Sequence, residues 1–277
     1  MDSQPPKSNP VLSVIVPAYR CPTIVHDLEA IDQYLQALNI PYELICVVDG
    51  VADKQDTTAK IAPKATKFGV QVYSYPENQG KGYAIRYGMA RARGTLIAFI
   101  DAGSDLNARG LGLALEHLKW YEADIIIGSK RHKASKINYP FNRRILSWIV
   151  QRATRFIFGF NVSDTQTGLK LFRREVLDDV LPRLLVKRWA FDIEILAVAH
   201  RLGYTQIYES PIELQFNNMS TLNYRSVINF AIDYLAIIYR IYILKYYNNS
   251  HQTDWEQDPN LTLKTKSPIK KSLPAKT

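Results

Sequence analysis

Short apolar runs alternate with segments of helical periodicity along the first hundred residues of the chain. The apolar runs cover residues 11–17, 42–48, 70–75 and 95–100. The helical segments between them cover residues 22–38, 57–67 and 80–93. A run that is apolar throughout indicates a strand buried on both faces, and such strands are typical of parallel sheets. Strands joined by helical crossovers pair in parallel with right-handed connections, so the sequence predicts a doubly wound α/β layer.

This regular alternation changes in the second half of the chain. Helices are expected at residues 108–121, 141–158 and 189–202. Extended segments are expected at residues 123–128, at the end of a loop over 162–173, and at 206–216. The predicted fold class is α/β, with a mostly parallel but mixed sheet flanked by helices in one domain over residues 11–223. The two ends, residues 1–10 and 248–277, are polar and contain prolines and lysines, and we expect them to be disordered.

The charge of the chain points to an anionic partner. Its formal net charge of +9 favours nucleic acid, an acidic membrane surface or phosphorylated substrates. Nucleic acid is disfavoured, because the basic residues are not interleaved with aromatic residues in a nucleic-acid-binding motif. The two cysteines, Cys21 and Cys46, lack metal-type spacing, which favours a reducing compartment. The N-terminus has no apolar signal segment, and no apolar window suffices for a confident membrane span, so we expect a cytoplasmic protein.

The last expected helix, over residues 224–247, has an unusual composition. Its polar residues recur at spacings of 3, 4 and 7 and so lie along one stripe: Ser226, Asn229, Asp233 and Arg240. Almost all of its other residues are apolar or aromatic, which is typical of a helix that lies in a membrane interface. The alternative is a helix packed on the domain core or in a homo-oligomer. A spanning helix would place Asp233 and Arg240 at bilayer depth.

Two carboxylates follow the apolar run at 95–100, in the segment Asp101-Ala-Gly-Ser-Asp105. Ligands bind at the carboxyl ends of strands in open α/β sheets, so both acids face a candidate site. Close carboxylates that leave room for water and phosphate suit Mg²⁺ or Mn²⁺, which accept oxygen ligands. The alternative is an Asp-rich turn, since turns also select Asp, Gly and Ser.

Other strand ends also carry candidate ligand-binding residues. The first strand ends in Pro17-Ala-Tyr19, and the second ends at Asp49. A Gly-rich segment containing Gly80 and Lys81 leads into a helix, and its N-terminus and lysine favour an anion, although the glycines also permit close packing. As an ordered set on consecutive strand ends, these features are more specific than each is alone.

These residues resemble glycosyltransferase family 2, whose members have a GT-A fold. The matching segments of the first half are Val14-Ile-Val-Pro-Ala-Tyr19, Val47-Val-Asp-Gly50, Asn78-Gln-Gly-Lys-Gly-Tyr-Ala84 and Phe99-Ile-Asp-Ala102. Two segments of the second half are Ser163-Asp-Thr-Gln-Thr-Gly-Leu-Lys-Leu-Phe-Arg173 and Arg188-Trp-Ala-Phe-Asp-Ile-Glu194. These two look like the polyprenyl-phosphate sugar synthases, which include dolichyl-phosphate glucosyltransferases and dolichol-phosphate mannose synthases.

The resemblance implies an enzyme, a hexosyltransferase. Members of this group move one hexose, glucose or mannose, from UDP-glucose or GDP-mannose to dolichyl or undecaprenyl phosphate, inverting the anomeric centre. The resemblance also implies a Mg²⁺ or Mn²⁺ cofactor and a peripheral place on the cytoplasmic membrane face. Two alternatives stay open: a family 2 transferase with a soluble or glycan acceptor, and a non-catalytic nucleotide-sugar-binding module on the membrane surface.

The resemblance further implies roles for individual residues. The donor nucleotide would be bound by Pro17, Ala18, Tyr19, Asp49, Gly80, Lys81, Asp101 and Ala102. The metal would be bound by Asp101 and Asp105. The acceptor phosphate would be met by Lys130, Arg131, Arg143, Ser147 and Lys170. The sugar and acceptor side would be shaped by Asp164, Gln166 and Glu194, and the catalytic residues would be Asp101, Asp105 and Asp192.

The chain departs from the family pattern at the second carboxylate. The family places its two acids as Asp-x-Asp, but Gly103 occupies the third position here. Either two inserted residues have moved the second acid to Asp105, or Asp105 is not a ligand and metal binding is weaker. Other predicted residues have purely structural alternatives. The basic residues at 130–144 could form a solvated face, and Asp192 or Glu194 could place a favourable charge at a helix start. Asp164 could simply form a turn.

Overall fold

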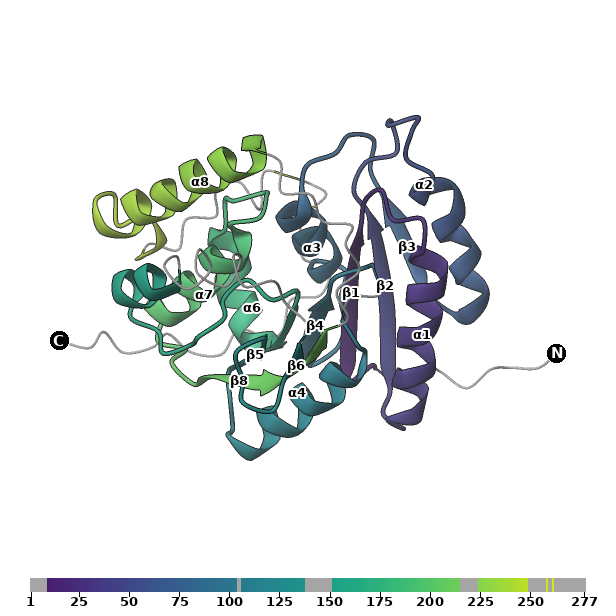
Figure 1. The fold of residues 1–277 in the computed structure, drawn as a ribbon, viewed down its shortest axis with the longest axis horizontal. Helices are drawn as coiled ribbons and strands as arrows, with labels where there is room; N and C mark the ends of the chain where they lie inside the picture. The colour runs from purple at the N-terminus through teal and green to yellow at the C-terminus, as the bar shows by residue number, and fades with distance from the viewer. Residues whose placement is uncertain are drawn as a thin grey trace.

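A seven-stranded mixed sheet with helices on both faces forms the centre of the protein (Figure 1). The computed structural model describes residues 9–103, 106–137, 151–214, 224–248, 258 and 261. The strands lie in the order β3-β2-β1-β4-β7-β5-β8. Their bounds are β1 (Leu12–Ala18), β2 (Tyr42–Val48), β3 (Gln71–Ser74), β4 (Leu96–Ile100), β5 (Ile125–Ser129), β7 (Leu169–Arg173) and β8 (Ile207–Pro211). A separate pair of parallel strands consists of β6 (Lys136–Ile137) and β9 (Glu213–Leu214).

The helices cover both faces of the large sheet. The α-helices are α1 (Ile24–Ala37), α2 (Thr58–Ile61), α3 (Lys81–Met89), α4 (Arg109–Trp120), α6 (Arg174–Val180), α7 (Phe191–Arg201) and α8 (Tyr224–Tyr242). The 3₁₀ turns are η1 (Ala62–Phe68), η2 (Leu181–Arg183) and η3 (Tyr246–Asn248), and residues 151–158 are also helical. α1 and α4 pack on one face of the sheet, whereas α3, α6 and α7 pack on the other.

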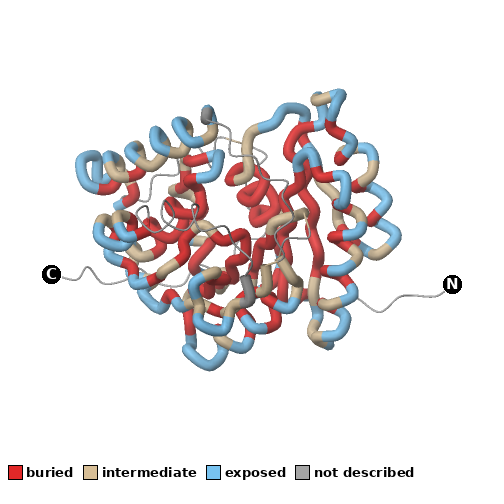
Figure 2. The backbone as a smooth tube through the Cα atoms, in the orientation of Figure 1, coloured by how far each residue is buried: buried red, intermediate tan, exposed pale blue. Residues whose placement is uncertain are grey.

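The central strands are apolar throughout because their alternate residues enter two separate cores. In β1, Ile15 packs in the core under α3, α6 and α7, whereas Val14 and Val16 pack in the core under α1 and α4. Every residue of β1 is buried, and Figure 2 shows buried backbone through the middle of the sheet. The predicted α/β class with a mostly parallel mixed sheet is confirmed.

β7 runs antiparallel between β4 and β5. The register pairs Ile100 of β4 with Leu169, and it pairs Ile127 of β5 with Lys170. An antiparallel strand begins at the edge where its neighbours end. The loop over residues 163–168 therefore lies at the edge where β1, β2 and β4 end, beside the motifs of the first half of the chain.

The helix predicted over residues 57–67 is wrong in its second part. α2 gives way after Ile61 to the 3₁₀ turn η1, because Pro63 has no N–H group and its ring clashes with the carbonyl four residues earlier. The sequence pattern also fails to predict α6 and β6, since neither of these short elements has a long periodic run.

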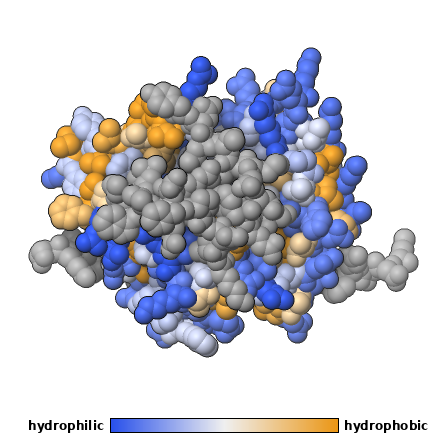
Figure 3. Space-filling view, in the orientation of Figure 1, coloured by the Kyte–Doolittle hydropathy of each residue, from blue (hydrophilic) through white to orange (hydrophobic). Residues whose placement is uncertain are grey.

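α8 packs on the core through one side and exposes apolar side chains on another. Ile237 and Ile241 are buried, and Arg240 turns inward, with its Nη1 atom 3.9 Å from Glu194 Oε1. We call the exposed large apolar residues of α8 and of the two positions after it the apolar stripe: Val227, Ile228, Ile232, Leu235, Tyr239, Tyr242, Ile243 and Leu244. Hydrophobic surface gathers over α8 at the upper left of Figure 3. Among the residues that the structure describes, no helix has both the length and the apolar character needed to cross a bilayer.

Two alanine substitutions test which side of α8 packs on the core. Ile237→Ala removes a fully buried side chain and should lower the free energy of unfolding by about 2–4 kcal/mol. Leu235→Ala removes a side chain that is 64% exposed, and it should change this free energy by less than about 0.5 kcal/mol. Denaturant unfolding followed by circular dichroism measures both values. Equal losses in the two variants would contradict this orientation of α8.

Candidate active site

Segments from both halves of the chain meet at the carboxyl edge of the large sheet. β1 and β2 end side by side, since their register pairs Ala18 with Val48. Asp101 directly follows β4, and its backbone N–H donates to the carbonyl oxygen of Gly168 at 2.8 Å. This bond joins the segment after β4 to the loop before β7, so the predicted motifs of the two halves lie together.

Asp49 holds the Gly-rich segment in front of α3. It is buried, and its carboxylate accepts hydrogen bonds of 2.8–3.2 Å from the Tyr75 hydroxyl, the Asn78 side-chain amide and the backbone N–H groups of Gln79 and Gly80. Gly80 has a φ angle of 105°, and a Cβ atom there would lie 2.6 Å from the Lys187 carbonyl oxygen. These contacts determine where α3 begins and thus where Lys81 lies. The predicted contact of Asp49 with the nucleotide base stays a prediction.

The two carboxylate oxygens of Asp101 have different surroundings. Oδ2 accepts a hydrogen bond from Lys81 Nζ at 2.9 Å, whereas Oδ1 is buried and has no hydrogen-bond partner among the described residues. Gly168 lies directly against this side chain, since a Cβ atom there would be 2.0 Å from Oδ2. A side chain at position 168 would therefore displace the Asp101 carboxylate.

Four ionisable side chains form ion pairs with one another at this edge, and we call them the charged cluster: Asp101, Lys81, Lys170 and Asp192. Lys81 Nζ also lies 3.3 Å from Asp192 Oδ2, and Lys170 Nζ lies 2.5 Å from Asp192 Oδ1. Burial alone raises the pKa of Asp192, but Lys170 and Lys81 outweigh it and hold this pKa below its ordinary value. Burial likewise lowers the pKa of Lys81, but Asp101 and Asp192 outweigh it, so this pKa lies above its ordinary value. Asp192 and Lys81 are therefore ionised at neutral pH.

The Asp101 carboxylate fits a divalent cation. Its buried Oδ1 atom has no hydrogen-bond donor within the part of the chain that the structure describes, and an oxygen of this kind is a suitable ligand for Mg²⁺ or Mn²⁺. Within the described ranges, no group of three or more His, Cys, Asp or Glu side chains could hold a metal. Mg²⁺ is usually held by one or two carboxylates together with substrate phosphates, so one carboxylate suffices beside a diphosphate. Asp105, the second predicted ligand, lies outside the described residues.

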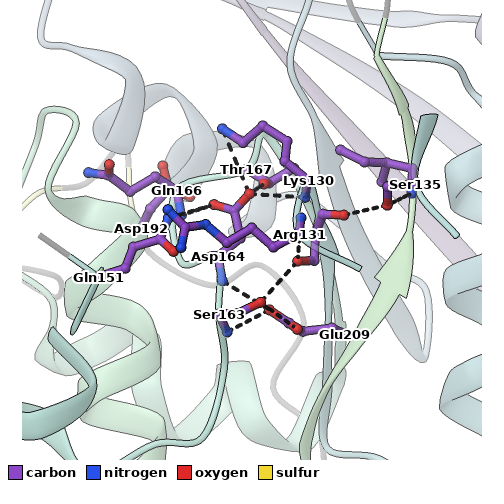
Figure 4. A network of polar contacts seen from close by, with 12 residues as sticks. Lys130, Arg131, Ser135, Gln151, Ser163, Asp164, Gln166, Thr167, Asp192 and Glu209 are labelled. Atoms are coloured by element: carbon purple, nitrogen blue, oxygen red, sulfur yellow. Dashed lines mark hydrogen bonds and ion pairs between the residues drawn. The ribbon is translucent and has the colours of Figure 1, made fainter. Parts of the chain in front are cut away.

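Asp164 joins the loop before β7 to the segment after β5 (Figure 4). It is fully buried, and its carboxylate accepts hydrogen bonds from the Lys130 backbone N–H, the Gln151 amide, the Gln166 backbone N–H and the Thr167 hydroxyl. Glu209 of β8 supports the loop from below, because its Oε1 atom accepts from the backbone N–H groups of Ser163 and Asp164 at 2.7 and 2.9 Å. Asp164 thus bridges two segments and does more than form a turn.

Two predicted acids of α7 point in different directions. Residues two positions apart on a helix differ by roughly 200° in orientation. Glu194 is fully buried, and it accepts from the Val186 backbone N–H at 2.9 Å and from the Tyr247 hydroxyl at 2.6 Å. Burial raises the pKa of Glu194 despite these hydrogen bonds. The structure brings Asp192, but not Glu194, to Asp101.

The remaining predicted residues lie at the rim of the site or outside the described ranges. Pro17 and Ala18 are buried, Ala102 is half-buried, and Tyr19 is exposed, with its hydroxyl donating to Asp53 at 3.1 Å. Lys130 is half-buried, with Nζ 3.8 Å from Asp164 Oδ2, and the Arg131 side chain is exposed. Arg143 and Ser147 lie outside the described residues.

The sequence pattern misses three residues at this site. Asp27 of α1 is buried and accepts a 2.9 Å hydrogen bond from the backbone N–H of Gly103, so it holds the segment after Asp101. Trp189 is exposed, and Lys81 Nζ lies 5.4 Å from its ring centroid. An acid within a short predicted strand, here between Tyr208 and Ser210, is a signal that could have revealed Glu209. Asp27 offers no such signal, since acids are common in first helical turns.

The model of one protein family, glycosyl transferase family 2, matches residues 13–181. The chain belongs to glycosyl transferase family 2. The match contains Lys81, Asp101 and Lys170 of the charged cluster. The resemblance inferred from the sequence motifs is thereby confirmed.

Several relatives are named dolichyl-phosphate beta-glucosyltransferase. The protein from Dictyostelium discoideum is 29% identical over 219 residues, which cover 73% of this chain and 66% of the relative. The Drosophila melanogaster protein is 35% identical over 210 residues, which cover 69% of this chain and 63% of the relative. The human protein is 33% identical over 218 residues, which cover 73% of this chain and 64% of the relative. The chain thus spans slightly less than two thirds of these relatives.

Solved structures share the fold. One of them is glucosyl-3-phosphoglycerate synthase from Mycobacterium tuberculosis, in complex with Mn²⁺, UDP and phosphoglyceric acid. It has a TM-score of 0.62 and 18% sequence identity, and the match covers 83% of this chain and 78% of that chain. Mannosyl-3-phosphoglycerate synthase from Rubrobacter xylanophilus has a TM-score of 0.59 and 16% identity over 85% of this chain and 75% of that chain. At this level of identity, the likeness concerns the fold alone, and it confirms the expected GT-A architecture.

Gly168→Ala tests whether the Asp101 carboxylate depends on the space at position 168. The added methyl group would push Asp101 aside, and we expect the affinity for Mn²⁺ in the presence of UDP to fall by about tenfold to hundredfold. Isothermal titration measures this affinity. In the control, Gly203→Ala strains a backbone with a φ of 98° but places a Cβ atom in open space, so it should leave the affinity unchanged. Unchanged Mn²⁺ binding by Gly168→Ala would contradict the geometry.

Proposed function

We propose that this protein transfers glucose from a nucleotide-diphosphate sugar to dolichyl phosphate, with inversion of the anomeric centre. The observation that carries the proposal is the carboxylate of Asp101 at the carboxyl edge of a family 2 fold. Beside the Lys81 ammonium, it presents a buried oxygen to which no described residue donates a hydrogen bond. The names of the relatives favour glucose over mannose and dolichyl phosphate over undecaprenyl phosphate.

UDP-glucose is the donor that we propose. A solved structure with this fold holds Mn²⁺ and UDP, which supports a uridine nucleotide and a divalent cation. Asp101 would hold Mg²⁺ or Mn²⁺, and the metal would neutralise charge on the leaving diphosphate. Lys81 is the first residue of α3, where the helix N-terminus favours an anion, so it adds a second positive charge at the same place.

The chain supplies positions and charges for a direct displacement. An oxygen of the acceptor phosphate attacks the anomeric carbon, and the bond from that carbon to the diphosphate breaks. The acceptor phosphate is anionic at neutral pH, so the step needs no strong general base and depends on orientation and charge. Lys130, fixed through its backbone by Asp164, and the exposed Arg131 would receive the acceptor phosphate. Lys170 is enclosed by Asp192 and the Thr167 carbonyl, so we propose that it acts through Asp192.

The apolar stripe of α8 would bring the enzyme to the membrane that carries the acceptor. Five exposed residues of the stripe follow each other at spacings of three and four residues, so they form one continuous face of the helix: Ile228, Ile232, Leu235, Tyr239 and Tyr242. Apolar and tyrosine side chains on one face of a helix suit a bilayer interface, and the net positive charge of the chain suits acidic lipids. We therefore propose a peripheral enzyme on the cytoplasmic membrane face.

A transfer assay tests the proposed activity. Purified protein, UDP-[³H]glucose, Mn²⁺ and dolichyl phosphate in vesicles should give a labelled lipid, and chelation of the metal should remove the activity. Asp101→Asn should lower kcat by about hundredfold or more, because an amide is a poorer ligand for a divalent cation. The matched control is Asp179→Asn, which changes an exposed carboxylate of α6 that accepts a hydrogen bond from the Tyr204 hydroxyl, and it should keep the wild-type rate.

The same assay separates the alternatives. Transfer to soluble glycans but not to dolichyl phosphate would show a family 2 enzyme with another acceptor. UDP-glucose binding by the folded protein without turnover on any acceptor would overturn the proposal in favour of a binding module.

Polar substitutions in the apolar stripe test the membrane contact. The double variant Ile232→Ser, Leu235→Ser should reduce co-flotation with vesicles of phosphatidylcholine and phosphatidylserine by about tenfold or more, because each change removes buried apolar area from the lipid contact. Leu113→Ser, an exposed apolar residue on α4, serves as the control and should float like the wild type. Full co-flotation of the double variant would exclude α8 as the membrane contact.

A further inference from the structure

The Lys81 ammonium occupies the space between two carboxylates of the charged cluster. Its Nζ atom lies 2.9 Å from Asp101 Oδ2 and 3.3 Å from Asp192 Oδ2, and only 11% of its side chain is exposed. The rings of Phe99 and Trp189 lie 5.7 and 5.4 Å away, which adds cation–π attraction. Lys81 is thus a counter-ion of the Asp101 carboxylate.

A divalent cation and Lys81 place positive charge at the same carboxylate. Asp101 is short, and its Oδ1 and Oδ2 atoms belong to one side chain that Gly168 confines. A divalent cation on Oδ1 would lie within a few ångströms of an ammonium bound to Oδ2, and the two positive charges would repel each other.

Lys81 can leave this position without exposing a bare charge on Asp192. Lys170 Nζ is 2.5 Å from the other oxygen of Asp192, so this carboxylate keeps a short hydrogen bond when Lys81 moves. The lysine side chain has four flexible carbons, and a diphosphate at the N-terminus of α3 would offer its ammonium an alternative anion.

We propose that Lys81 competes with the divalent cation for Asp101 and that the nucleotide diphosphate relieves this competition by drawing Lys81 to its phosphates. This inference rests on the proposed function, because it concerns the same donor site. Metal and nucleotide then promote each other's binding, and the promotion is reciprocal, as linkage requires. Asp101 binds free metal weakly and accepts it mainly together with the donor.

Binding measurements on the full chain test the competition without any turnover. Mn²⁺ is titrated into the protein with and without UDP, and free Mn²⁺ is followed by electron paramagnetic resonance. In the wild type, UDP should tighten Mn²⁺ binding by about tenfold to hundredfold. Lys81→Met should bind Mn²⁺ without UDP about tenfold more tightly than the wild type does, and UDP should tighten its Mn²⁺ binding much less.

Two further variants show whether the effect passes through Asp101. Lys187→Met removes a nearby lysine whose Nζ lies over the Tyr83 ring, so it controls for a general loss of positive charge and should bind Mn²⁺ like the wild type. In the Asp101→Asn background, Lys81→Met should no longer tighten Mn²⁺ binding, because the shared carboxylate is gone. Thermal unfolding of each variant confirms that it is folded.

The outcomes separate this inference from the proposed activity. Equal Mn²⁺ affinities of folded Lys81→Met and wild type in the absence of UDP would overturn the competition, even if the wild type transfers glucose. A wild type that shows the competition and the coupling but transfers glucose to no acceptor would support this inference and contradict the proposed function.

Discussion

The direction of β7 is the constraint on which the site depends. β7 lies between β4 and β5 and runs against both, so it begins where they end. This reversal places Gly168 against Asp101 and brings Lys170 to Asp192. A parallel strand in the same place would begin at the opposite edge of the sheet and would carry the loop over residues 163–168 away from the N-terminal motifs.

Buried carboxylates hold the loops around the site. Asp49 fixes the segment before α3, Asp164 fixes the segment after β5, and Glu194 fixes residues 185–186 beside α7. Each of these buried acids accepts hydrogen bonds from backbone N–H groups, as buried polar groups must to be tolerated. Asp101 differs from them, because Oδ1 lacks a hydrogen-bond partner among the described residues. That difference is the reason why we propose Asp101 as the acid that holds the metal.

α8 is connected to the site through buried groups as well as through packing. Glu194 accepts from the Tyr247 hydroxyl beyond α8 and lies 3.9 Å from Arg240 on α8 itself. The same carboxylate accepts from the Val186 backbone N–H, and the next residue, Lys187, accepts from the Tyr83 backbone N–H of α3 at 3.0 Å. The helix with the apolar stripe and the helix that begins at Lys81 are therefore attached to one polar network.

The sequence by itself determined the strands that carry the site and much of the chemistry at their ends. Continuous apolar runs predicted β1, β2 and β4, and the polar residues that follow them had to lie at one edge because parallel strands end together. The family motifs then pointed to Asp101, Lys81 and Asp192, which the structure brings within hydrogen-bonding distance. Local periodicity and short motifs suffice for such inferences, since they depend on neighbouring residues in the chain.

Only the tertiary structure decided which side chains become partners. The direction of β7, the hydrogen bond of Asp27 to Gly103 and the support from Glu209 are contacts between residues far apart in the chain. The same is true of the contacts of Glu194. Helical geometry predicts that Glu194 and Asp192 point in different directions, but only the packing of the chain brings Glu194 to Val186 and Tyr247. Periodicity tells which face of an element is buried, but it does not tell which element covers that face. Non-local pairing makes that choice, and it decided that Lys81 lies between Asp101 and Asp192.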